Sequence, residues 1–265
     1  MLSRNGVAGE AVYPRVVLRA ADAGLVDIVL IAIRRDQVTD ALPKLRQIRP
    51  STVVSLIGLP RGLDELELKR GSQRYVPALP GVTGTIRADG VVDYLEVAQQ
   101  PTTVGRAARE PWATALFRSA GFSTAASTDM TAWLAAHAIF IAAFESAIVS
   151  CPGGLSALAA DPRSVRSLVL AVREGLSALH DRDIPVFPTS IRVIFLGMPV
   201  WFASWYSRRA LGGPLGVLGM AQHSLASRRT ELPALQDDVR AILKGQKIPL
   251  LEAVFGRLSA KNLLA

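Results

Sequence analysis

The sequence predicts a doubly wound α/β sheet followed by an all-helical C-terminal domain. Two observations support this prediction. Up to about Ser127, short β runs alternate with helical segments, a pattern typical of a sheet with helices on both faces. From Asp129 onward, long helical segments follow one another without a strand between them. We therefore expect two domains, residues 1–127 and 128–265.

The α/β half begins with a continuous apolar run, Asp27 to Ile33, which is typical of a parallel strand buried on both faces. Asp36 to Ile48 then carries apolar residues at helical spacing, with Pro43 as a kink or a short start. Further strands are predicted where β-rich runs are bounded by glycine and proline: Thr52–Ile57, Arg74–Ala78, Val91–Val97 and Thr102–Val104. Further helices are predicted at Leu63–Arg70 and Trp112–Ala120.

The helical half opens with a segment that Thr128 or Asp129 can cap, and Cys151-Pro152-Gly153-Gly154 ends it. We expect a helix from Met130 to Ser150. The remaining predicted helices are Pro162–Arg182, Ile191–Tyr206, Pro214–Arg229, Pro233–Lys244 and Leu250–Leu258. Pro199 should kink the one that contains it.

Composition excludes several classes of protein. The 265 residues are half apolar, which is enough to build two cores. The single cysteine, Cys151, excludes an internal disulfide framework and a cysteine-based zinc site, so we expect no metal and a reducing compartment, the cytoplasm. The N-terminal residues lack the uninterrupted apolar stretch of a secretory signal.

Neither a membrane nor a nucleic acid is an expected partner. The longest apolar runs, Thr131–Phe144, Val193–Tyr206 and Ala210–Gln222, are about 14 residues or shorter, below the roughly 20 that span a bilayer. The formal charge of +8 comes from basic residues scattered from Arg4 to Lys261, without a stripe interleaved with aromatic residues. Such a surface is equally compatible with anionic small molecules such as phosphorylated cofactors.

Three stretches together resemble the ketopantoate reductase family. Asp27 to Gln37 is similar to the family's third strand and the lysine and glutamine that follow it. Trp133 to Gly154 matches in spacing the long helix that opens the family's helical domain, down to its ending Cys-Pro-x-Gly. Met220-Ala-Gln222 followed by Arg228 to Glu231 is similar to a late helix and its active-site glutamate. The resemblance implies an incomplete Rossmann-type sheet followed by a helical domain.

The resemblance also implies an NADP-dependent oxidoreductase that passes hydride from NADPH to the carbonyl carbon of a small 2-oxo acid or related carbonyl compound. The cofactor-binding residues that it implies are Arg34, in place of the lysine, Gln37 and Gly58. The catalytic residues are Glu231, which is retained, and His223, which replaces an aspartate. Two of these also have an ordinary explanation, because Arg34 suits a solvated strand end and Glu231 a helix start.

The chain departs from the family pattern at two places. The strand followed by G-x-G-x-x-G has no counterpart, so we expect a partial nucleotide-binding domain without its first βαβ unit and with one edge of the Asp27–Ile33 strand unpaired. On the long helix, Ala135, Ile139 and Ala143 match the family's lysine and two asparagines, but cannot protonate an alkoxide or hold a substrate oxygen. His137 lies roughly 160° around the helix on an aromatic stripe, so we expect it to pack.

Three functional alternatives remain open. The first is a reductase of this superfamily that acts on another substrate. The second is a non-catalytic binding or oligomeric relative, which the apolar helix face favours; Ile57 and Gly219 also stand where the family has an asparagine and a serine. The third is a truncated product, which an in-frame strand and G-x-G-x-x-G encoded upstream of Met1 would reveal. The sequence does not decide whether the cofactor is NADP or NAD, or whether the protein is a homodimer or a monomer.

Overall fold

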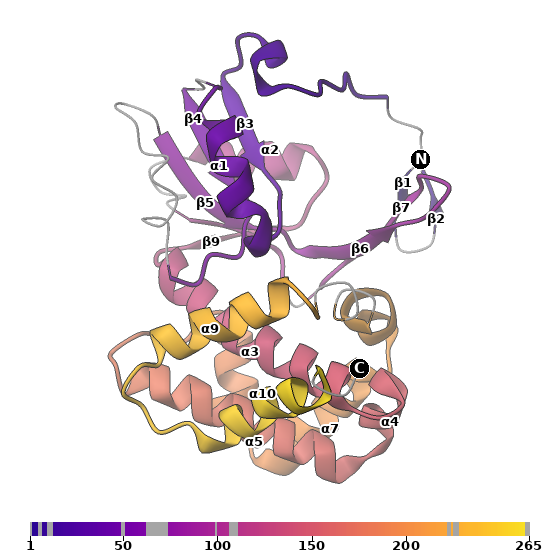
Figure 1. Cartoon of the computed structure of the whole chain (residues 1–265), viewed down its shortest axis with the longest axis vertical. Coiled ribbons are helices and arrows are strands. Elements are labelled where there is room, and N and C mark those ends of the chain that lie inside the picture. Colours follow the sequence, from indigo (N-terminus) through magenta and orange to yellow (C-terminus); the bar gives the residue numbers. More distant parts are fainter. Residues whose placement is uncertain are drawn as a thin grey trace. The chain divides into compact units, whose positions relative to one another are not determined.

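The computed structural model describes residues 2–4, 7–9, 13–48, 51–61, 74–98, 100–105, 111–221, 224 and 228–262. The chain divides into two compact units, which Figure 1 shows. A sheet unit comprises Met1–Val82 and Ile86–Thr131, and a helical unit comprises Thr83–Thr85 and Ala132–Ala265. A mixed sheet with flanking helices is thus followed by a helical C-terminal part, which confirms the predicted fold class.

The sheet unit is built on five strands in the order β3-β4-β5-β8-β9. Their bounds are β3 Ile28–Ile31, β4 Thr52–Ser55, β5 Arg74–Leu79, β8 Thr102–Gly105 and β9 Thr124–Ser127. β3, β4 and β5 are parallel, β8 runs antiparallel to β5, and β9 runs parallel to β8. The four strands that the sequence predicts here are confirmed, and β9 is an additional one.

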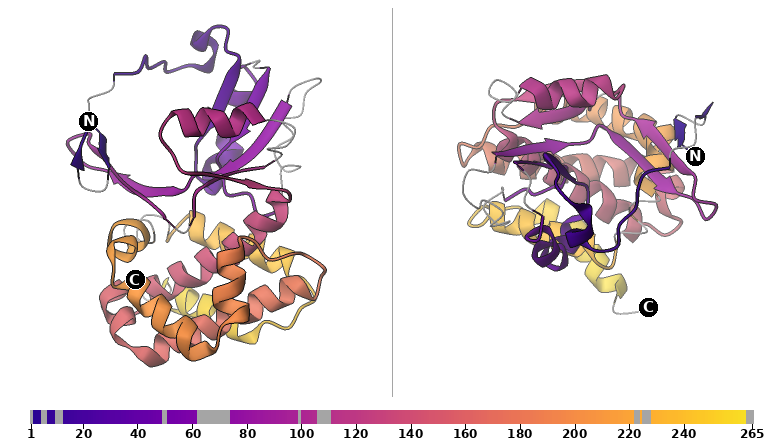
Figure 2. Two further views of the ribbon diagram at one scale, coloured as in Figure 1. Left: turned by 180° about the vertical axis from the view of Figure 1, so that it is seen from behind. Right: turned by 90° about the horizontal axis from the view of Figure 1, so that it is seen from above.

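Helices cover both faces of this sheet. α1 (Val38–Leu45) packs on the face that contains Val53, and α2 (Pro111–Ser119) packs on the face that contains Val54. Neighbouring residues of a strand point to opposite faces, so these two valines belong to two separate cores. Figure 1 shows α1 in front of the sheet, and Figure 2 shows α2 from behind.

β3 is the edge strand of the sheet. The expectation that it is buried on both faces is wrong for one of them: Ile28 and Leu30 are 39% and 49% exposed, whereas Ile31 is buried on the α1 side. The other face is covered by α2 only where β4, β5 and β8 lie. Within the described residues no strand pairs with the outer edge of β3.

A second, small sheet contains the strand predicted at Val91–Val97, which is confirmed as β7, and further strands that the sequence did not predict. β1 (Leu2–Arg4) pairs antiparallel with β2 (Val7–Ala8) and parallel with β7 (Val92–Glu96). β6 (Val82–Ile86) precedes β7 along the chain. Strands of two or three residues are too short to show an alternating pattern. The predicted helix Leu63–Arg70 lies outside the described residues.

The described helical unit follows the predicted order of helices, except that the predicted helix Pro214–Arg229 is π-helical over residues 215–221 and lies partly outside the described residues. Its helices are α3 (Met130–Ser150), α4 (Gly154–Ala160), α5 (Pro162–His180), α6 (Thr189–Arg192), α7 (Val200–Leu211), α9 (Glu231–Ile242) and α10 (Pro249–Asn262). Two π-helical turns, η4 (Val193–Gly197) and η5 (Leu215–Ala221), lie between them. The long first helix has the predicted bounds, and α4 was not predicted.

The predicted helix Ile191–Tyr206 is wrong as a single element. Proline disfavours a helical conformation in the residue before it, and Met198 accordingly adopts φ −91° and ψ 154°. Met198 N donates to Val193 O at 2.9 Å, which closes a π-turn, and α7 begins directly after Pro199. The proline therefore separates two elements instead of kinking one.

α3 forms the centre of the helical unit. By length and composition it could cross a membrane, with a mean hydropathy of 1.7, but 78% of that window is buried inside the protein. Its buried side chains join those of α5 and α10 in the largest hydrophobic cluster of the described chain. A helix that is apolar on all sides and buried in this way has the character of a core helix.

Candidate functional site

The cofactor-binding candidates of the sheet unit lie near the carboxyl ends of β3 and β4. Arg34 follows β3, and Gly58 follows β4. The two strands are parallel, with Ile31 beside Ser55, so both residues lie toward the same edge of the sheet. Open α/β sheets bind their ligands at this edge. A Cβ added to Gly58 would meet no atom within 4 Å, so the space beside its backbone is open.

Arg34 and Gln37 are engaged with their own turn, the 3-10 helix η2 (Arg35–Gln37). The Arg34 guanidinium forms a bidentate ion pair with Asp36, with Nε 3.0 Å from Oδ1 and Nη2 2.9 Å from Oδ2. The backbone N–H of Arg34 donates to Gln37 Oε1 at 3.0 Å. A carboxylate thus balances the cation, and an anionic ligand would compete with Asp36 for it.

The two residues that flank Gly58 in the sequence are apolar. Ile57, at the position of the family's asparagine, is buried in the α1-side core with Leu59 and Tyr75. Burial raises the pKa of Tyr75 to about 12, so its hydroxyl stays protonated at neutral pH. Polar contacts at this edge would therefore come from the turn after β3, where Arg34 lies, and not from Ile57.

The helix face that matches the family's lysine and asparagines belongs to the core of the helical unit. Ala135, Ile139 and Ala143 are all buried in the cluster that α3 forms with α5 and α10. A Cβ on Gly175 of α5 would lie 2.7 Å from Ile139 Cγ2 and 3.0 Å from Leu251 Cδ2. Ile139 thus fills a notch that only glycine leaves open, and these three α3 side chains offer no donor to a substrate oxygen.

His137 packs on the aromatic stripe of α3. Its ring stacks on Trp133, with the centroids 5.1 Å apart, and lies 6.5 Å from the ring of Phe140. Nδ1 is buried and has no hydrogen-bond partner among the described residues. Burial lowers the pKa of His137 to about 4, so the imidazole is neutral at pH 7. These observations agree with packing and not with proton donation to a carbonyl oxygen.

Of the two catalytic candidates, Glu231 is described and His223 lies outside the described residues. Glu231 is the first residue of α9, where a carboxylate interacts favourably with the helix N-terminus, and its Oε2 atom is buried. Arg34, Gln37 and Gly58 therefore follow two neighbouring parallel strands of the sheet unit, while Glu231 belongs to the helical unit.

One buried polar contact was not expected from the sequence. Gln236 of α9 donates from Nε2 to Ser146 Oγ of α3 at 2.8 Å, and Ser146 Oγ donates to the carbonyl of Ala142. Glu145 and Asp238 are buried as well. The sequence signal for this contact is the pair Glu145-Ser146 inside an otherwise apolar helix, because buried polar groups need hydrogen-bond partners across the core.

In the described part of the chain, no group of three or more His, Cys, Asp or Glu side chains could hold a metal ion.

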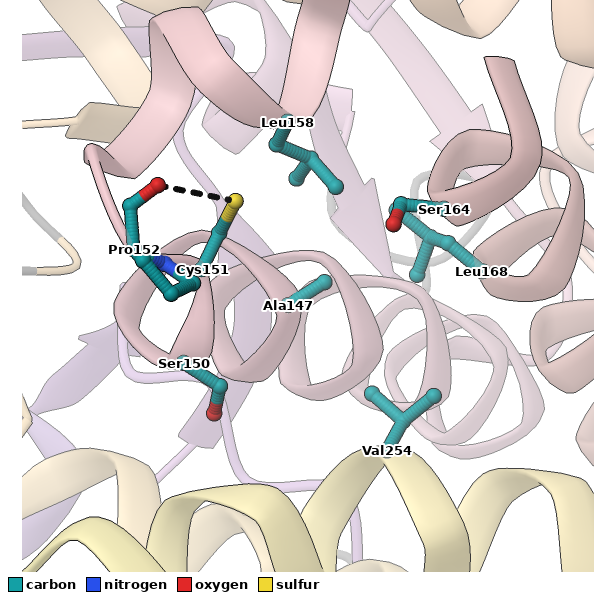
Figure 3. A pocket seen from close by; sticks show the side chains of 8 residues that line it. All are labelled: Ala147, Ser150, Cys151, Pro152, Leu158, Ser164, Leu168 and Val254. Atoms are coloured by element: carbon teal, nitrogen blue, oxygen red, sulfur yellow. Dashed lines mark hydrogen bonds between the residues drawn. The ribbon is translucent and has the colours of Figure 1, made fainter. Parts of the chain in front are cut away.

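A cavity of about 180 Å³ lies within the helical unit, at the C-terminal end of α3. It is lined by Ala147, Ser150, Cys151, Pro152, Leu158, Ser164, Leu168 and Val254. Figure 3 shows the Cys151 thiol among the side chains that line the cavity, with Sγ 3.7 Å from the carbonyl oxygen of Pro152. None of the residues that the sequence predicts for the site lines this cavity. It lacks the convergent polar groups that usually orient a substrate.

No protein-family model matches the sequence, and no curated protein matches it. Solved structures do match. A 2-dehydropantoate 2-reductase from Geobacter metallireducens gives a TM-score of 0.72 at 15% identity, over 98% of this chain and 85% of that chain. D-mandelate dehydrogenase, in a ternary structure with NADH and anilino(oxo)acetate, gives 0.69 at 13% identity, over 98% and 84%. A dimeric ketopantoate reductase from Staphylococcus aureus gives 0.63 at 12% identity, over 88% and 76%.

At these identities the likeness is one of fold, and it extends over both units of the chain. It agrees with the family that the three stretches of sequence indicate. The chain therefore has the fold of the ketopantoate reductases and of D-mandelate dehydrogenase, a mixed parallel sheet with flanking helices followed by a helical C-terminal domain.

Proposed function

We propose that this chain is a ketopantoate reductase-like, NAD(P)H-dependent oxidoreductase that acts on a small 2-oxo acid or related carbonyl compound, with an altered substrate side. The supporting observation is the likeness in fold, which spans 98% of the chain. The names of the two neighbours, a 2-dehydropantoate 2-reductase and a D-mandelate dehydrogenase, give different substrates. The fold therefore accommodates more than one substrate. The single cysteine supports the cytoplasm as its compartment.

The sheet unit fits one part of such a cofactor. Arg34 would meet a phosphate or a substrate carboxylate at the carboxyl edge, and the open space at Gly58 would admit a ligand to the backbone. NAD(P)H would supply the hydride. The fit is incomplete, because the connection from Ala32 to Arg34 has no glycine turn whose N–H groups could cradle a pyrophosphate, and because Arg34 is paired with Asp36.

The residues that would contact the substrate differ from those of the family that this chain resembles. Reduction of a ketone places negative charge on the carbonyl oxygen, which a cation or a proton donor must meet. The buried Ala135, Ile139 and Ala143 cannot do so. We propose Glu231, with His223 as the second candidate, as the polar group that orients substrate. A carboxylate orients a hydroxyl but does not neutralise an alkoxide, so reduction of ketopantoate itself should be slow or absent.

The test of the cofactor proposal is a titration of the purified chain with NADPH, followed by quenching of the nicotinamide fluorescence and by the thermal midpoint. A ligand that binds only the folded state at about a hundred times its Kd adds about 2.7 kcal/mol of stability, which a thermal scan detects. Arg34→Ala should abolish the binding. Asp36→Asn should strengthen it, because it removes a carboxylate that competes with an anionic ligand for the Arg34 guanidinium in a partly exposed ion pair that contributes at most about 1 kcal/mol.

The matched control is Asp40→Asn on α1, which removes the same charge from an exposed site nearby and should leave the affinity nearly unchanged. If wild type and Asp36→Asn neither quench NADPH fluorescence nor gain thermal stability, the cofactor proposal is wrong. Where binding is seen, consumption of NADPH is followed with ketopantoate and with the 2-oxo acid that corresponds to mandelate.

A second function is favoured by one observation, the burial of the α3 face in the core. A non-catalytic relative that keeps this fold for binding or assembly needs neither a proton donor at Ala135 nor an amide at Ile139. It predicts no NADPH consumption with any 2-oxo acid, and no gain from Ala135→Lys, because that side chain would enter an apolar core. Turnover of any such acid by wild type at a rate that depends on Glu231 would rule it out.

A further inference from the structure

The cavity at the C-terminal end of α3 has a deeply buried apolar floor. Leu158 of α4, Leu168 of α5 and Val254 of α10 form this floor, and each is at most 3% exposed. Figure 3 shows these side chains around the end of α3. Pro152 also lines the cavity and is exposed, so the enclosed space lies close to solvent on that side. A small molecule would therefore have a short path into it.

The cavity follows from the small side chains at the end of α3. Earlier turns of the helix carry phenylalanine rings that pack on one another, whereas the last turn and the residue after it contribute Ala147, Ser150 and Cys151 to the lining. The chain then turns at Gly153 and Gly154, whose φ angles of 88° and 66° favour glycine. Neither glycine has a side chain that could fill the space, so the packing of the surrounding helices leaves it open.

Water is a poor occupant of this cavity. The Ser164 hydroxyl already donates to Asp161 Oδ2 at 2.6 Å, and the Cys151 thiol donates to the carbonyl of Pro152 at 3.7 Å. Ser150 Oγ is buried and has no hydrogen-bond partner among the described residues, so it is the one polar side chain of the lining left to bind a water. A buried water ordinarily makes about three hydrogen bonds, and cavities without such partners stay dry.

We infer that this cavity is a binding site for a small uncharged molecule with an apolar body of about six to eight non-hydrogen atoms. Its volume of about 180 Å³ is similar to that of an engineered apolar cavity of about 150 Å³ that holds benzene. None of the eight lining side chains is charged, so a charged ligand would leave water without meeting an opposite charge. Neither Arg34 nor Glu231 lines the cavity, so this site is separate from the proposed cofactor and substrate residues.

The expected affinity is modest, because a ligand of this size makes few contacts. With about seven non-hydrogen atoms, it should bind with a Kd on the order of 1 mM or somewhat lower. The ligand would contact side chains of α3, α4, α5 and α10 in the folded protein only, so binding should raise the thermal midpoint. Cys151 is the only cysteine of the chain, so labelling of its thiol reports occupancy of the cavity at one position.

The test uses toluene as the probe and benzoate as its charged counterpart. The rate at which a thiol reagent labels Cys151 in the whole chain is measured over a range of concentrations of each compound, together with the thermal midpoint. Toluene should slow the labelling about twofold at a concentration equal to its Kd, and it should raise the thermal midpoint. Benzoate should do neither, although the formal charge of +8 attracts anions to the surface.

Two variants fill the cavity from different helices. Ala147→Leu on α3 and Val254→Phe on α10 each place a larger apolar side chain in the space, and each should abolish both effects of toluene. Circular dichroism checks that they fold, and Val254→Phe replaces Ala147→Leu if the latter does not. The matched control is Ala160→Leu, which makes the same substitution at an exposed position of α4 outside the lining and should respond to toluene as wild type does.

A wild type whose labelling rate and thermal midpoint do not respond to toluene would overturn the inference. The same holds for filled variants that still respond, for a response to benzoate equal to that to toluene, and for a loss of response in Ala160→Leu. These measurements need no NADPH, and a chain that does not bind the cofactor should still bind toluene here. The inference therefore stands or fails independently of the proposed enzymatic function.

Discussion

Gly175 is the residue that lets the apolar face of α3 pack against α5. Gly175→Ala would place a methyl group 2.7 Å from Ile139 Cγ2, and such overpacking typically costs about 1–3 kcal/mol. Ile139→Ala removes that Cγ2 atom and should cost about 2–5 kcal/mol through the cavity it leaves. The double variant should be less destabilised than the sum of the two, by about 1 kcal/mol, because the alanine methyl enters the vacated space. Urea denaturation measures all three.

Gly256 in α10 is the control for this cycle, because a Cβ added there would meet no atom within 4 Å. Gly256→Ala should stabilise the protein by roughly 0.5–1 kcal/mol, as expected for a helical glycine without steric constraint. Strict additivity of Gly175→Ala and Ile139→Ala would show that the two side chains do not share space.

His137 should make stability depend on pH. Its pKa of about 4 in the folded protein lies below the ordinary 6.5, so between these values the unfolded chain binds more protons. The free energy of unfolding should therefore fall as the pH is lowered from about 6.5 to about 4, by up to about 3 kcal/mol from this group, with no such contribution above that window. His137→Phe keeps an aromatic ring and removes the titration.

Denaturation of wild type and His137→Phe at a series of pH values checks this. The difference in unfolding free energy between the two should be constant above pH 7 and should change in favour of the variant on acidification. A difference that is independent of pH would show that the imidazole is accessible to water in the folded protein.

Residue by residue, the sequence predicts which side chains are apolar but not what they touch. Ala135, Ile139 and Ala143 share a helix face by spacing alone, so the loss of the family's polar groups is visible in the sequence. Their contact with Gly175 is not, because it joins positions on two helices through the packing of the unit. Likewise, the resemblance of Asp27–Gln37 to the family does not predict that Asp36 forms an ion pair with Arg34.

At the scale of elements, the start of α5 depends on one side chain. Asp161 accepts hydrogen bonds from Arg163 N at 3.0 Å and from Ser164 N at 3.2 Å, while Pro162 occupies the first helical position. The Ser164 hydroxyl and these N–H groups hold the pKa of Asp161 below its usual range. Asp161→Ala should lower the free energy of unfolding, and Asp161→Asn should lower it much less, because asparagine keeps the acceptor. Chemical denaturation of both variants tests the cap.

Elements with strong local signals were predictable, and those made by pairing were not. Met130–Ser150 combines an apolar run with a stop at Cys151-Pro-Gly-Gly, and its bounds were predicted as they are found. β9, with the sequence Thr-Ala-Ala-Ser, has little intrinsic strand preference and exists because it pairs with β8. The break at Pro199 was visible as a proline, but its outcome depends on Met198 closing a π-turn onto Val193.

For the whole molecule, the sizes of the cores predict the order in which the chain opens. The described helical unit has one large continuous cluster, whereas the sheet unit has two small ones on opposite faces of its sheet. Because burial of apolar area is the main stabilising contribution, the sheet unit should open first. Hydrogen exchange followed by mass spectrometry should show faster exchange in β3–β5 than in α3 and α5. Gly175→Ala should speed exchange in the helices and leave the strands unchanged.

The fold as a whole was more predictable than the site. Alternation of strands and helices, followed by helices alone, is a property of the entire sequence, and it survives the loss of individual side chains. A site depends on a few groups from distant segments, and here several of the expected groups are replaced. The family-level resemblance therefore led to the correct fold, while the roles of Arg34, Gln37, Gly58, Glu231 and His223 remain predictions.

The outer edge of β3, with which no described strand pairs, has a consequence for storage of the purified protein. Strand edges with exposed apolar side chains act as templates for strands of other molecules, and Ile28 and Leu30 give this edge such a face. Loss of material on storage should then proceed by strand addition between sheet units while the helical core is still intact. The shelf life would then depend on the sheet unit and the melting temperature on the helical core. Leu30→Lys should therefore lengthen the shelf life without raising the melting temperature.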